Sequence, residues 1–378
     1  MAETTVLSGL DLTKWRPKMI REISRKSGLE PYMGNSSTDI IHVVNDLKSS
    51  GNTIRVPLVA RLQGNGVSGN TRLSGSEERM DQYYQDVSWE YYRNAIEISK
   101  KEREKSAVNL LEERTPLLKE WAGELIKYQL IDCMHTMSDG TTYANASAGT
   151  RNTFVTNNAD RVLFGKLKSN YSTTMATALA TLDTTDDILS PTIGSLAKRI
   201  ARTATPHIRP YNTEDGKEYF VMFCHPLAFK SLKSNATIIA NNQYARAREG
   251  DGMSKNPLFQ DGDLMDDGII YREMPEFWQP RQGNISSTNV NTNTHLVNAG
   301  ASGTTDVAVN FLCGQQALAF VNKQAVTPIT KKEDDYNFFD GVGIEMAHGM
   351  SKLRWNNGSG TNKDLGMVTV YTAIVADA

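Results

Sequence analysis

The sequence predicts an α+β fold, in which strands and helices occupy separate stretches of the chain. Three observations support this prediction. Residues 53–98 contain two stretches of alternating apolar and polar residues, which is typical of half-buried strands. Residues 100–137 instead repeat apolar residues every three or four positions, which predicts a long helix. Residues 306–378 return to strand-like patterns.

The composition is that of a folded, nearly neutral protein. Of the 378 residues, 39% are hydrophobic and 22% are charged, which allows a sizeable core. The formal net charge of −2 argues against tight binding of nucleic acid through bulk charge, since such binding needs many Lys and Arg contacts. We find no apolar run near the length of a membrane span and no signal peptide at the start.

The three cysteines, Cys133, Cys224 and Cys313, are far apart and form no C-x-x-C pair. We therefore expect neither a disulfide framework nor a zinc site, and a reducing compartment fits this cysteine usage.

Residues 1–50 are expected to form an N-terminal arm rather than a domain. Six basic residues between positions 14 and 26 are accompanied by a single acid, Glu22. The basic residues are Lys14, Arg16, Lys18, Arg21, Arg25 and Lys26. Two interpretations stay open: a solvated helix face, or an arm that reaches an acidic neighbour or nucleic acid.

Residues 51–98 are expected to form one long hairpin. Pro57 places the outgoing strand at a sheet edge, because proline donates no hydrogen bond to a ladder. In the returning strand, the alternation predicts that Val87, Trp89 and Tyr91 share one face.

Between these strands lies the stretch QGNGVSGN, with the spacing Gly64-x-Gly66-x-x-Gly69 of a dinucleotide-binding loop. Such a site requires the third glycine to open an apolar helix whose amino terminus holds the pyrophosphate. The following residues contain another glycine, Gly75, and no helical apolar pattern. We therefore interpret the glycines as a flexible, twisting hairpin tip, and a nucleotide-binding enzyme is only a distant alternative.

The helical pattern between residues 100 and 137 predicts a helix of more than 20 residues, about 30 Å long at 1.5 Å per residue. Pro116 leaves two alternatives. Either Thr115 caps a helix with Pro116 in its first turn, or a longer helix kinks at Pro116. Trp121 is interpreted as a core residue. Residues 138–160 are small and polar, and we expect a loop excursion there.

The middle of the chain mixes helices and strands. We expect a helix over residues 191–204, preceded by Asp186 and Asp187, whose charge suits the positive end of a helix. Residues 280–305 are low in complexity and would be disordered in isolation.

No motif indicates catalysis. The acid-rich stretch DGDLMDDG lacks the spacing of a calcium-binding loop and instead predicts a turn at Asp267-Gly268. No Walker loop, H-E-x-x-H motif or G-x-S-x-G elbow occurs. We expect no catalytic residue, cofactor site or metal site.

Three longer stretches carry a resemblance. The first is PLVARLQGNGVSGNTRLSGSEERMDQYYQDVSWEYYRNAIE, which contains Leu73, Gly75, Glu77 and Glu78. The second is YFVMFCHPLAFKSLK, followed by NPLFQDGDLMDDGIIYREMP, and the third comprises FLCGQQALAFVNKQ and DDYNFFDGVGIEMAHGMSKLRW. In this order they resemble the major capsid proteins of tailed bacteriophages with the Hong Kong 97-type fold. The four named residues fall like the "LeGnEE" signature of the branch typified by phage N-four.

The resemblance covers roughly residues 50–378 and implies a Hong Kong 97-type fold with peripheral and axial domains. Its implied divisions are an N-terminal arm (1–50), an extended hairpin loop (51–98), a peripheral domain with the spine helix and the polar excursion (99–185), an axial domain (186–305) and return strands of the peripheral domain (306–378).

The resemblance also implies a function: a subunit that assembles with itself, as hexameric and pentameric capsomers, into the icosahedral head around double-stranded DNA. The extended loop would lie over a neighbouring subunit, and the six basic residues of the arm would make further contacts. The implied loop contacts are Gly64, Gly66, Gly69, Leu73, Gly75, Glu77, Glu78, Trp89 and Tyr91.

Further partners implied by the resemblance are a portal, a separate scaffolding protein and, in heads that have one, a cement protein. Packaged DNA would be contacted weakly and without sequence preference, and no membrane is involved. The subunit would be assembled in the cytoplasm of the bacterial host and would end in the virion. The alternative within the same fold is the shell protein of an encapsulin-like compartment.

Overall fold

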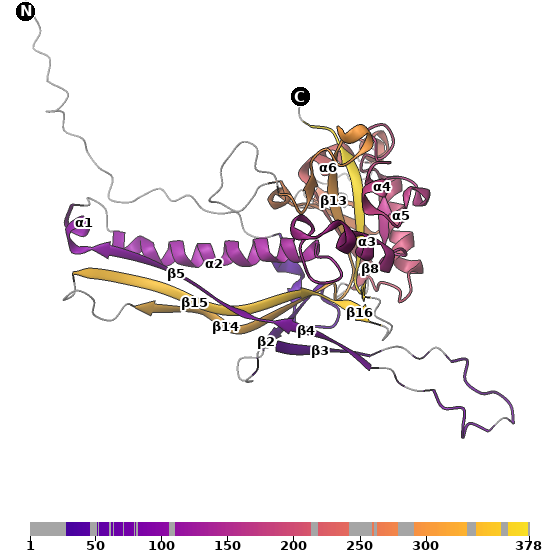
Figure 1. Cartoon of the computed structure of the whole chain (residues 1–378), viewed down its shortest axis with the longest axis horizontal. Coiled ribbons are helices and arrows are strands. Elements are labelled where there is room, and N and C mark those ends of the chain that lie inside the picture. Colours follow the sequence, from indigo (N-terminus) through magenta and orange to yellow (C-terminus); the bar gives the residue numbers. More distant parts are fainter. Residues whose placement is uncertain are drawn as a thin grey trace, which may run out of the picture. The chain divides into compact units, whose positions relative to one another are not determined.

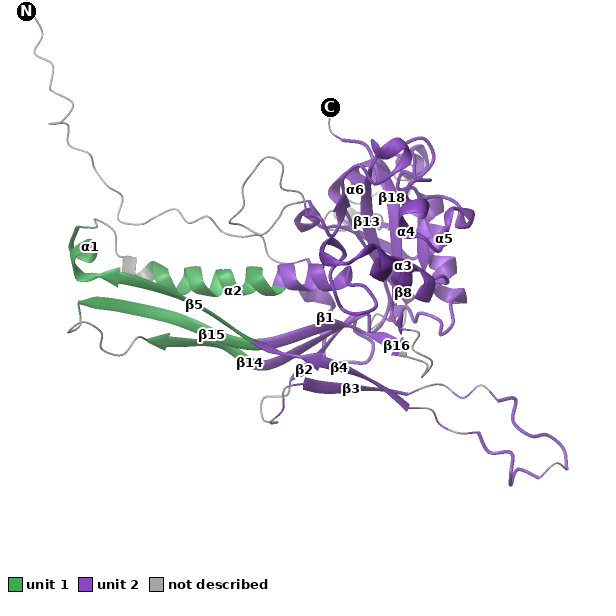
Figure 2. Ribbon diagram, viewed as in Figure 1, with its two compact units in different colours: residues 1–26, 91–126, 324–347 green, residues 27–90, 127–323, 348–378 purple. Residues whose placement is uncertain are grey.

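The computed structural model describes residues 28–45, 51, 53–59, 62, 64–70, 72–78, 80, 82–105, 110–212, 218–241, 259–260, 263–278, 291–330, 338–356 and 362–376. The chain divides into two units, drawn in different colours in Figure 2. Unit 1 comprises residues 1–26, 91–126 and 324–347, and unit 2 comprises the rest. The six basic residues predicted for the arm lie outside the described residues.

Unit 1 packs a helix against strands. Its elements are α1 (Lys100–Lys105), the first part of α2 (Leu110–Met134), most of β5 (Glu90–Ser99), and parts of β14 (Leu318–Thr330) and β15 (Phe339–Lys352). In Figure 1 the first part of α2 lies along β5 and β15. Helix residues three and four apart meet strand residues two apart, which is how a helix face packs on a sheet face. The buried residues are Leu118, Ala122, Leu125, Val342, Ile344 and Met346.

The predicted long helix is confirmed by α2, whose 25 residues span about 37 Å at 1.5 Å per residue. Of the two alternatives for its start, the longer helix forms, because Pro116 lies inside α2. Trp121 packs against the buried cluster of unit 1, as predicted for a core residue.

The predicted hairpin forms in unit 2. β3 (Thr53–Val59) pairs antiparallel with β4 (Gln82–Ser88), from Thr53 opposite Ser88 to Val59 opposite Gln82. The two strands form a sheet of their own, so Pro57 lies on an edge strand as predicted.

The returning strand is interrupted at Trp89, which the sequence did not predict. β4 ends at Ser88, and β5 joins a five-stranded sheet with the order β1-β2-β14-β15-β5. The alternation restarts after the interruption, because the chain changes sheets there. Tyr91 is therefore 53% exposed, whereas Tyr92 packs against the core of unit 1. The prediction that Tyr91 shares a face with Val87 and Trp89 was wrong.

Most of unit 2 is built on a nine-stranded sheet. Its main path runs β6 (Val162–Phe164), β18 (Met367–Ile374), β13 (Asp306–Cys313), β8 (Glu218–Cys224), β11 (Ile269–Glu273), β10 (Asp263–Asp266) and β9 (Phe259–Gln260). β12 (His295–Leu296) pairs with β13, and β7 (Tyr211–Asn212) pairs with β8. Unit 2 also contains β1 (Met33–Gly34), β2 (Ile41–Asn45), β16 (Arg354–Asn356) and β17 (Asn362–Asp364).

Helices cover this sheet. They are α3 (Ala148–Asn157), α4 (Met175–Leu179), α5 (Pro191–Thr203) and α6 (Pro226–Lys233). The 3-10 turns are η1 (Glu30–Tyr32), η2 (Tyr143–Asn145), η3 (Lys168–Asn170), η5 (Pro275–Phe277) and η6 (Ala301–Gly303). α5 buries Ile193, Ala197 and Ile200, whose spacing of four and three places them on one helical face. They pack in the same core as Phe220 of β8 and Val370 of β18.

The nine-stranded sheet contains strands from before and after residue 305, where the resemblance implies the end of the axial domain. β13 and β18 lie beside β6 and β8, whereas β14 and β15 belong to the five-stranded sheet. Residues 306–378 therefore contribute strands to both sheets.

Residues 138–160 are not simply a loop excursion, because they contain α3. The Ser147 hydroxyl caps this helix by accepting the N–H of Thr150 at 3.1 Å. Phe154 and Val155 are buried on its inner face. The many small polar residues in this stretch give no helical pattern, so the helix was not predicted. It is stabilised by its cap and by burial of Phe154 and Val155.

Two further predictions differ in detail. Asp187 does not serve the amino terminus of α5. It accepts the N–H of Lys166 at 2.8 Å and that of Asp183 at 3.3 Å, so it organises the preceding loops. Within the low-complexity stretch, residues 291–305 are described and folded, and β12 lies there. Asn293 donates to Asp132 at 2.8 Å and accepts the N–H of Ala144 at 3.0 Å.

Candidate assembly surface

The base of the hairpin is held inside unit 2 by apolar contacts. Val56 of β3 and Val87 of β4 face inward and are almost fully buried. They belong to a cluster with Ala319, Val321 and Leu353, of which the first two lie on β14. The inner face of the ribbon is thus part of a core.

A cross-strand ion pair fixes the register of the ribbon. Arg55 and Asp86 are direct partners in the ladder, and the guanidinium donates two hydrogen bonds to the carboxylate, at 2.8 and 3.0 Å. The guanidinium also lies over the ring of Tyr84, 3.7 Å from its centroid. The hydrogen bond from Arg55 lowers the pKa of Asp86. This planar, two-pronged geometry favours one strand register over a slipped one.

The tip beyond the strands contains glycines with positive φ and two hydrogen bonds from backbone N–H groups to carboxylates. Gly66, Gly69 and Gly75 have φ values of 66°, 66° and 93°, which residues other than glycine rarely adopt. Glu78 accepts the N–H of Gly64 at 2.8 Å, and Glu77 accepts that of Gly75 at 2.7 Å. The glycines and acids predicted as loop contacts are therefore brought together here.

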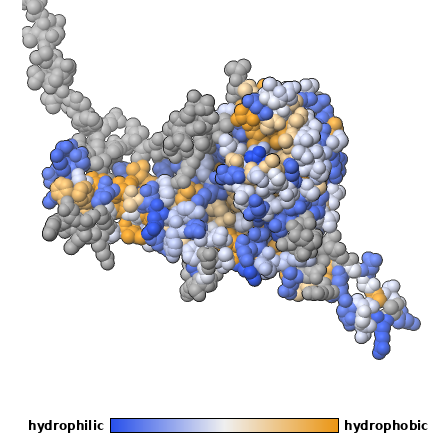
Figure 3. Space-filling model, in the orientation of Figure 1, coloured by the Kyte–Doolittle hydropathy of each residue, from blue (hydrophilic) through white to orange (hydrophobic). Residues whose placement is uncertain are grey.

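The hairpin also carries large apolar side chains in water. Leu62 is 63% exposed and Leu73 is 61% exposed, and Figure 3 shows the tip as mostly hydrophilic with isolated apolar positions. Other exposed apolar side chains of the hairpin are Val59, Val67, Met80 and Tyr84. Single exposed apolar side chains are common on protein surfaces. A two-stranded ribbon that carries several of them is only marginally stable in water by itself.

Trp89 joins the two ends of the hairpin. Its indole N–H donates to the carbonyl oxygen of Gly51 at 2.9 Å. The ammonium of Lys323 lies 5.8 Å from the centroid of the ring. The other aromatic residue predicted as a contact, Tyr91, belongs to unit 1, so the structure does not group it with the hairpin.

Unit 1 has exposed apolar side chains that the sequence analysis missed. They are Leu117, Val326, Ile329, Phe338 and Phe339. Figure 3 shows apolar patches on this unit. The last six residues of β14 are exposed on both faces. Of these side chains, the apolar pair Phe338-Phe339 could have been noticed in the sequence, because it stands within an otherwise polar stretch.

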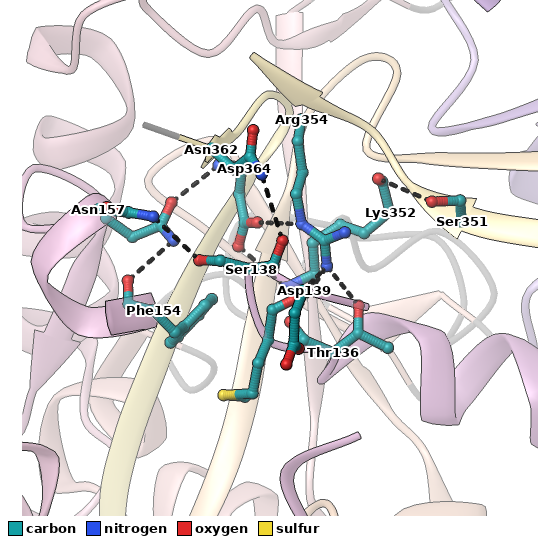
Figure 4. A network of polar contacts seen from close by, with 12 residues as sticks. Thr136, Ser138, Asp139, Phe154, Asn157, Ser351, Lys352, Arg354, Asn362 and Asp364 are labelled. Carbon is teal, nitrogen blue, oxygen red and sulfur yellow. Dashed lines mark hydrogen bonds and ion pairs between the residues drawn. The ribbon is translucent and has the colours of Figure 1, made fainter. Parts of the chain in front are cut away.

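A buried polar network lies next to the hairpin base (Figure 4). The ammonium of Lys352 contacts the Asp364 carboxylate at 2.9 Å, and the Arg354 guanidinium lies 3.7 Å from the same carboxylate. Arg354 also donates to the Thr136 hydroxyl at 2.8 Å. Burial lowers the pKa of Lys352, although the charge of Asp364 opposes this shift. Leu353 lies between the two cations in sequence and packs against Val56 and Val87 of the hairpin. The network therefore holds in place a residue on which the hairpin base packs.

A second buried polar group is a histidine pair. His225 accepts the N–H of Leu227 through Nδ1 at 3.3 Å, so its proton lies on Nε2. This Nε2 lies 3.4 Å from Nδ1 of His295, whose Nε2 lies 3.1 Å from a carboxylate oxygen of Asp306. Asn310 accepts the backbone N–H of His225 at 3.0 Å. The arrangement caps α6 with a neutral imidazole.

Comparison with known proteins gives the family. The family model for phage capsid proteins matches residues 3–376. The chain belongs to the phage capsid protein family. The major capsid protein of Pseudomonas phage KPP25 is 23% identical, over 96% of this chain and 94% of that one.

Solved phage capsids share the fold of this capsid protein. The capsid of cyanophage Pam1 has a TM-score of 0.84 at 30% identity, over 100% of both chains. The capsid of Ralstonia phage GP4 has a TM-score of 0.73 at 20% identity, again over 100% of both chains. The predicted Hong Kong 97-type fold and the predicted role as a capsid subunit are confirmed, and the protein is a component of the virion.

The dinucleotide-binding alternative lacks its structural context in this capsid protein. Residues 72–78, beyond Gly69, are described as turns and extended chain, and the next element is β4. Among the described residues, no group of three or more His, Cys, Asp and Glu side chains could hold a metal ion. In the same part of the chain, no helix is long and apolar enough to cross a membrane.

Proposed function

We propose that this capsid protein is the major subunit of the icosahedral head of a tailed phage, and that its hairpin lies over a neighbouring subunit. The observation that supports this arrangement is the contrast within one ribbon. Its inner residues Val56 and Val87 are buried in unit 2, whereas Leu62 and Leu73 of its tip are exposed. An isolated two-stranded ribbon is marginally stable in water. Burial of the tip on another copy would stabilise it.

We assign hexameric and pentameric capsomers to the assembled state. In this proposal the nine-stranded sheet is the axial domain at capsomer centres, and it includes β13 and β18. Unit 1, with the first part of the spine helix α2, is the peripheral domain. The N-terminal arm, with basic residues from Lys14 to Lys26, contacts neighbouring subunits.

The subunit acts as a container wall and performs no catalytic step in this proposal. The net charge of −2 supports a weak, non-specific contact with packaged double-stranded DNA, because few phosphates could be neutralised. Assembly in the host cytoplasm, a portal, a separate scaffolding protein and, in some heads, a cement protein complete the proposed setting.

The test is negative-stain electron microscopy of the purified chain, alone and under crowding or added salt. We expect closed shells, capsomer rings or tubes, and a diameter of phage-head size would separate this function from an encapsulin-like compartment. A matched variant replaces residues 60–81 with Asn-Gly. Because Val59 and Gln82 are partners in the ladder, this two-residue turn can join them directly. The variant should fold but not assemble, and normal shells from it would contradict the proposed role of the tip.

A further inference from the structure

One side chain closes the hairpin tip across its loop. The carboxylate of Glu78 accepts the backbone N–H of Gly64 at 2.8 Å, although 14 positions separate the two residues. Strand pairing ends at Val59 and Gln82, so this bond lies beyond the ladder. It connects the outgoing and returning segments of the tip.

The glycine at position 64 is explained by this contact. Gly64 is not among the glycines with positive φ, so its backbone conformation does not demand glycine. A Cβ built at this position would lie 2.7 Å from the Glu78 oxygen and 3.3 Å from its carboxyl carbon. Gly66 and Gly69 differ, because their φ is positive and an added Cβ would meet nothing within 4 Å. Gly64 therefore gives the carboxylate access to the N–H.

The neighbouring acid stabilises the adjacent turn. Ser76 donates its N–H to the carbonyl of Leu73 at 2.9 Å, and Glu77 accepts the N–H of Gly75 within this turn. Leu62 and Leu73, the most exposed leucines of the tip, thus lie next to the segments that the two carboxylates hold.

We propose that Glu78 is a positioning residue, which closes the tip on Gly64 and so holds Leu62 and Leu73 in place for a neighbouring subunit. The inference rests on the proposed function of the hairpin. A hydrogen bond between a carboxylate and an amide is stronger than one between neutral groups. A tip that is already closed loses less conformational entropy on docking, and this increases the affinity between subunits.

The test compares Glu78→Ala, Glu78→Gln, Gly64→Ala and the double variant Gly64→Ala/Glu78→Ala in the full-length chain. Assembly is measured as the fraction of subunit that sediments as shells, and tip closure as hydrogen–deuterium exchange of the Gly64 segment in unassembled subunit. Glu78→Ala should speed this exchange and reduce the assembled fraction several-fold, without lowering the melting temperature. Glu78→Gln should recover part of both readouts, since its amide oxygen accepts the same N–H in a weaker, neutral hydrogen bond.

The double variant gives the sharpest outcome. Because Gly64→Ala displaces the same carboxylate, the double variant should be no worse than the more affected single variant. Gly66→Ala is the matched control, since it strains the backbone instead and should add to the effect of Glu78→Ala. Normal shells from Glu78→Ala, or additive losses in the double variant, would overturn the proposal. A wild-type chain without shells, in which Gly64 exchange still responds to Glu78, would instead count against the proposed function alone.

Discussion

Trp89 and Gly51 face each other across the two ends of the hairpin, and the indole N–H donates to the glycine carbonyl at 2.9 Å. Gly51 precedes β3, and Trp89 follows β4, at the point where the chain passes from the two-stranded sheet to the five-stranded sheet. The bond therefore ties the two ends of the ribbon to each other.

Replacing Trp89 with Ala should give a folded subunit that assembles poorly. The ring is only partly buried, so the loss of its hydrogen bond should lower the free energy of unfolding by about 1 kcal/mol. Thermal unfolding and the fraction of sedimenting shells would measure the two effects. Tyr91→Ala, at an exposed position of β5, is the control for loss of an aromatic ring. If Trp89→Ala unfolds the subunit and assembly only follows that loss, Trp89 is a core residue instead.

Replacing Asp364 with Asn should destabilise unit 2 strongly. The change leaves the buried cations Lys352 and Arg354 without their shared carboxylate. Breaking a buried ion pair on one side costs about 3–5 kcal/mol. Urea unfolding followed by circular dichroism would measure the loss.

Lys352→Met is the matched control for that substitution. It removes one cation, and with it the ammonium that lies 5.1 Å from the centroid of the Phe154 ring, but it leaves the Asp364 carboxylate with Arg354. Its effect on the free energy of unfolding should be the smaller of the two. The reverse order would show that Asp364 does not hold this network together.

The long elements of this capsid protein were predictable, because their patterns are local. The alternation in β3 and the spacing of apolar residues in α2 each lie within one stretch. The turn at Asp267-Gly268 was also predictable. Both residues have positive φ, as a two-residue hairpin turn requires, and they join β10 to β11.

The remaining features depend on partners that are distant in sequence. The Arg161 guanidinium donates to the backbone carbonyl of Asp364, which lies 203 positions away in sequence. No local sequence pattern predicts such a contact. The interruption at Trp89 arises because β4, before it, and β5, after it, belong to two different sheets. Gly64 and Glu78 were both identified as loop residues, but only their contact explains why the glycine is there.

Acid should destabilise the subunit through its buried histidines. Burial, with a smaller contribution from His295, lowers the pKa of His225 to about 3, and burial lowers that of His135 to about 3. An unfolded histidine titrates near 6.5. Between these values the unfolded state binds more protons, so stability is fully present above about pH 6.5 and is lost as the pH falls toward about 3.

His225→Asn tests this assignment, because asparagine also accepts hydrogen bonds at the start of a helix but does not titrate in this range. The acid-unfolding midpoint, followed by circular dichroism, should move to lower pH in the variant. Identical acid profiles for variant and wild type would show that the cap of α6 does not contribute to acid sensitivity.

Deleting residues 1–26 should weaken assembly more than folding. The six basic residues of the arm are lost, whereas the elements described from Glu30 onward stay intact. The melting temperature of the truncated subunit and its yield of shells would be compared with those of the full chain. Intact shells in normal yield would exclude an assembly role for the arm.

The position of β18 has a consequence for how the subunit is made. This strand lies between β6 and β13 in the interior of the nine-stranded sheet, yet it follows every other strand of that sheet in sequence. A nascent chain that has not reached Ile374 therefore leaves β6 and β13 without their common neighbour. Pairings between such distant segments form slowly, because a long loop must close first. Translation must pass β18 before the subunit can mature, so prematurely terminated chains would be excluded from the growing shell.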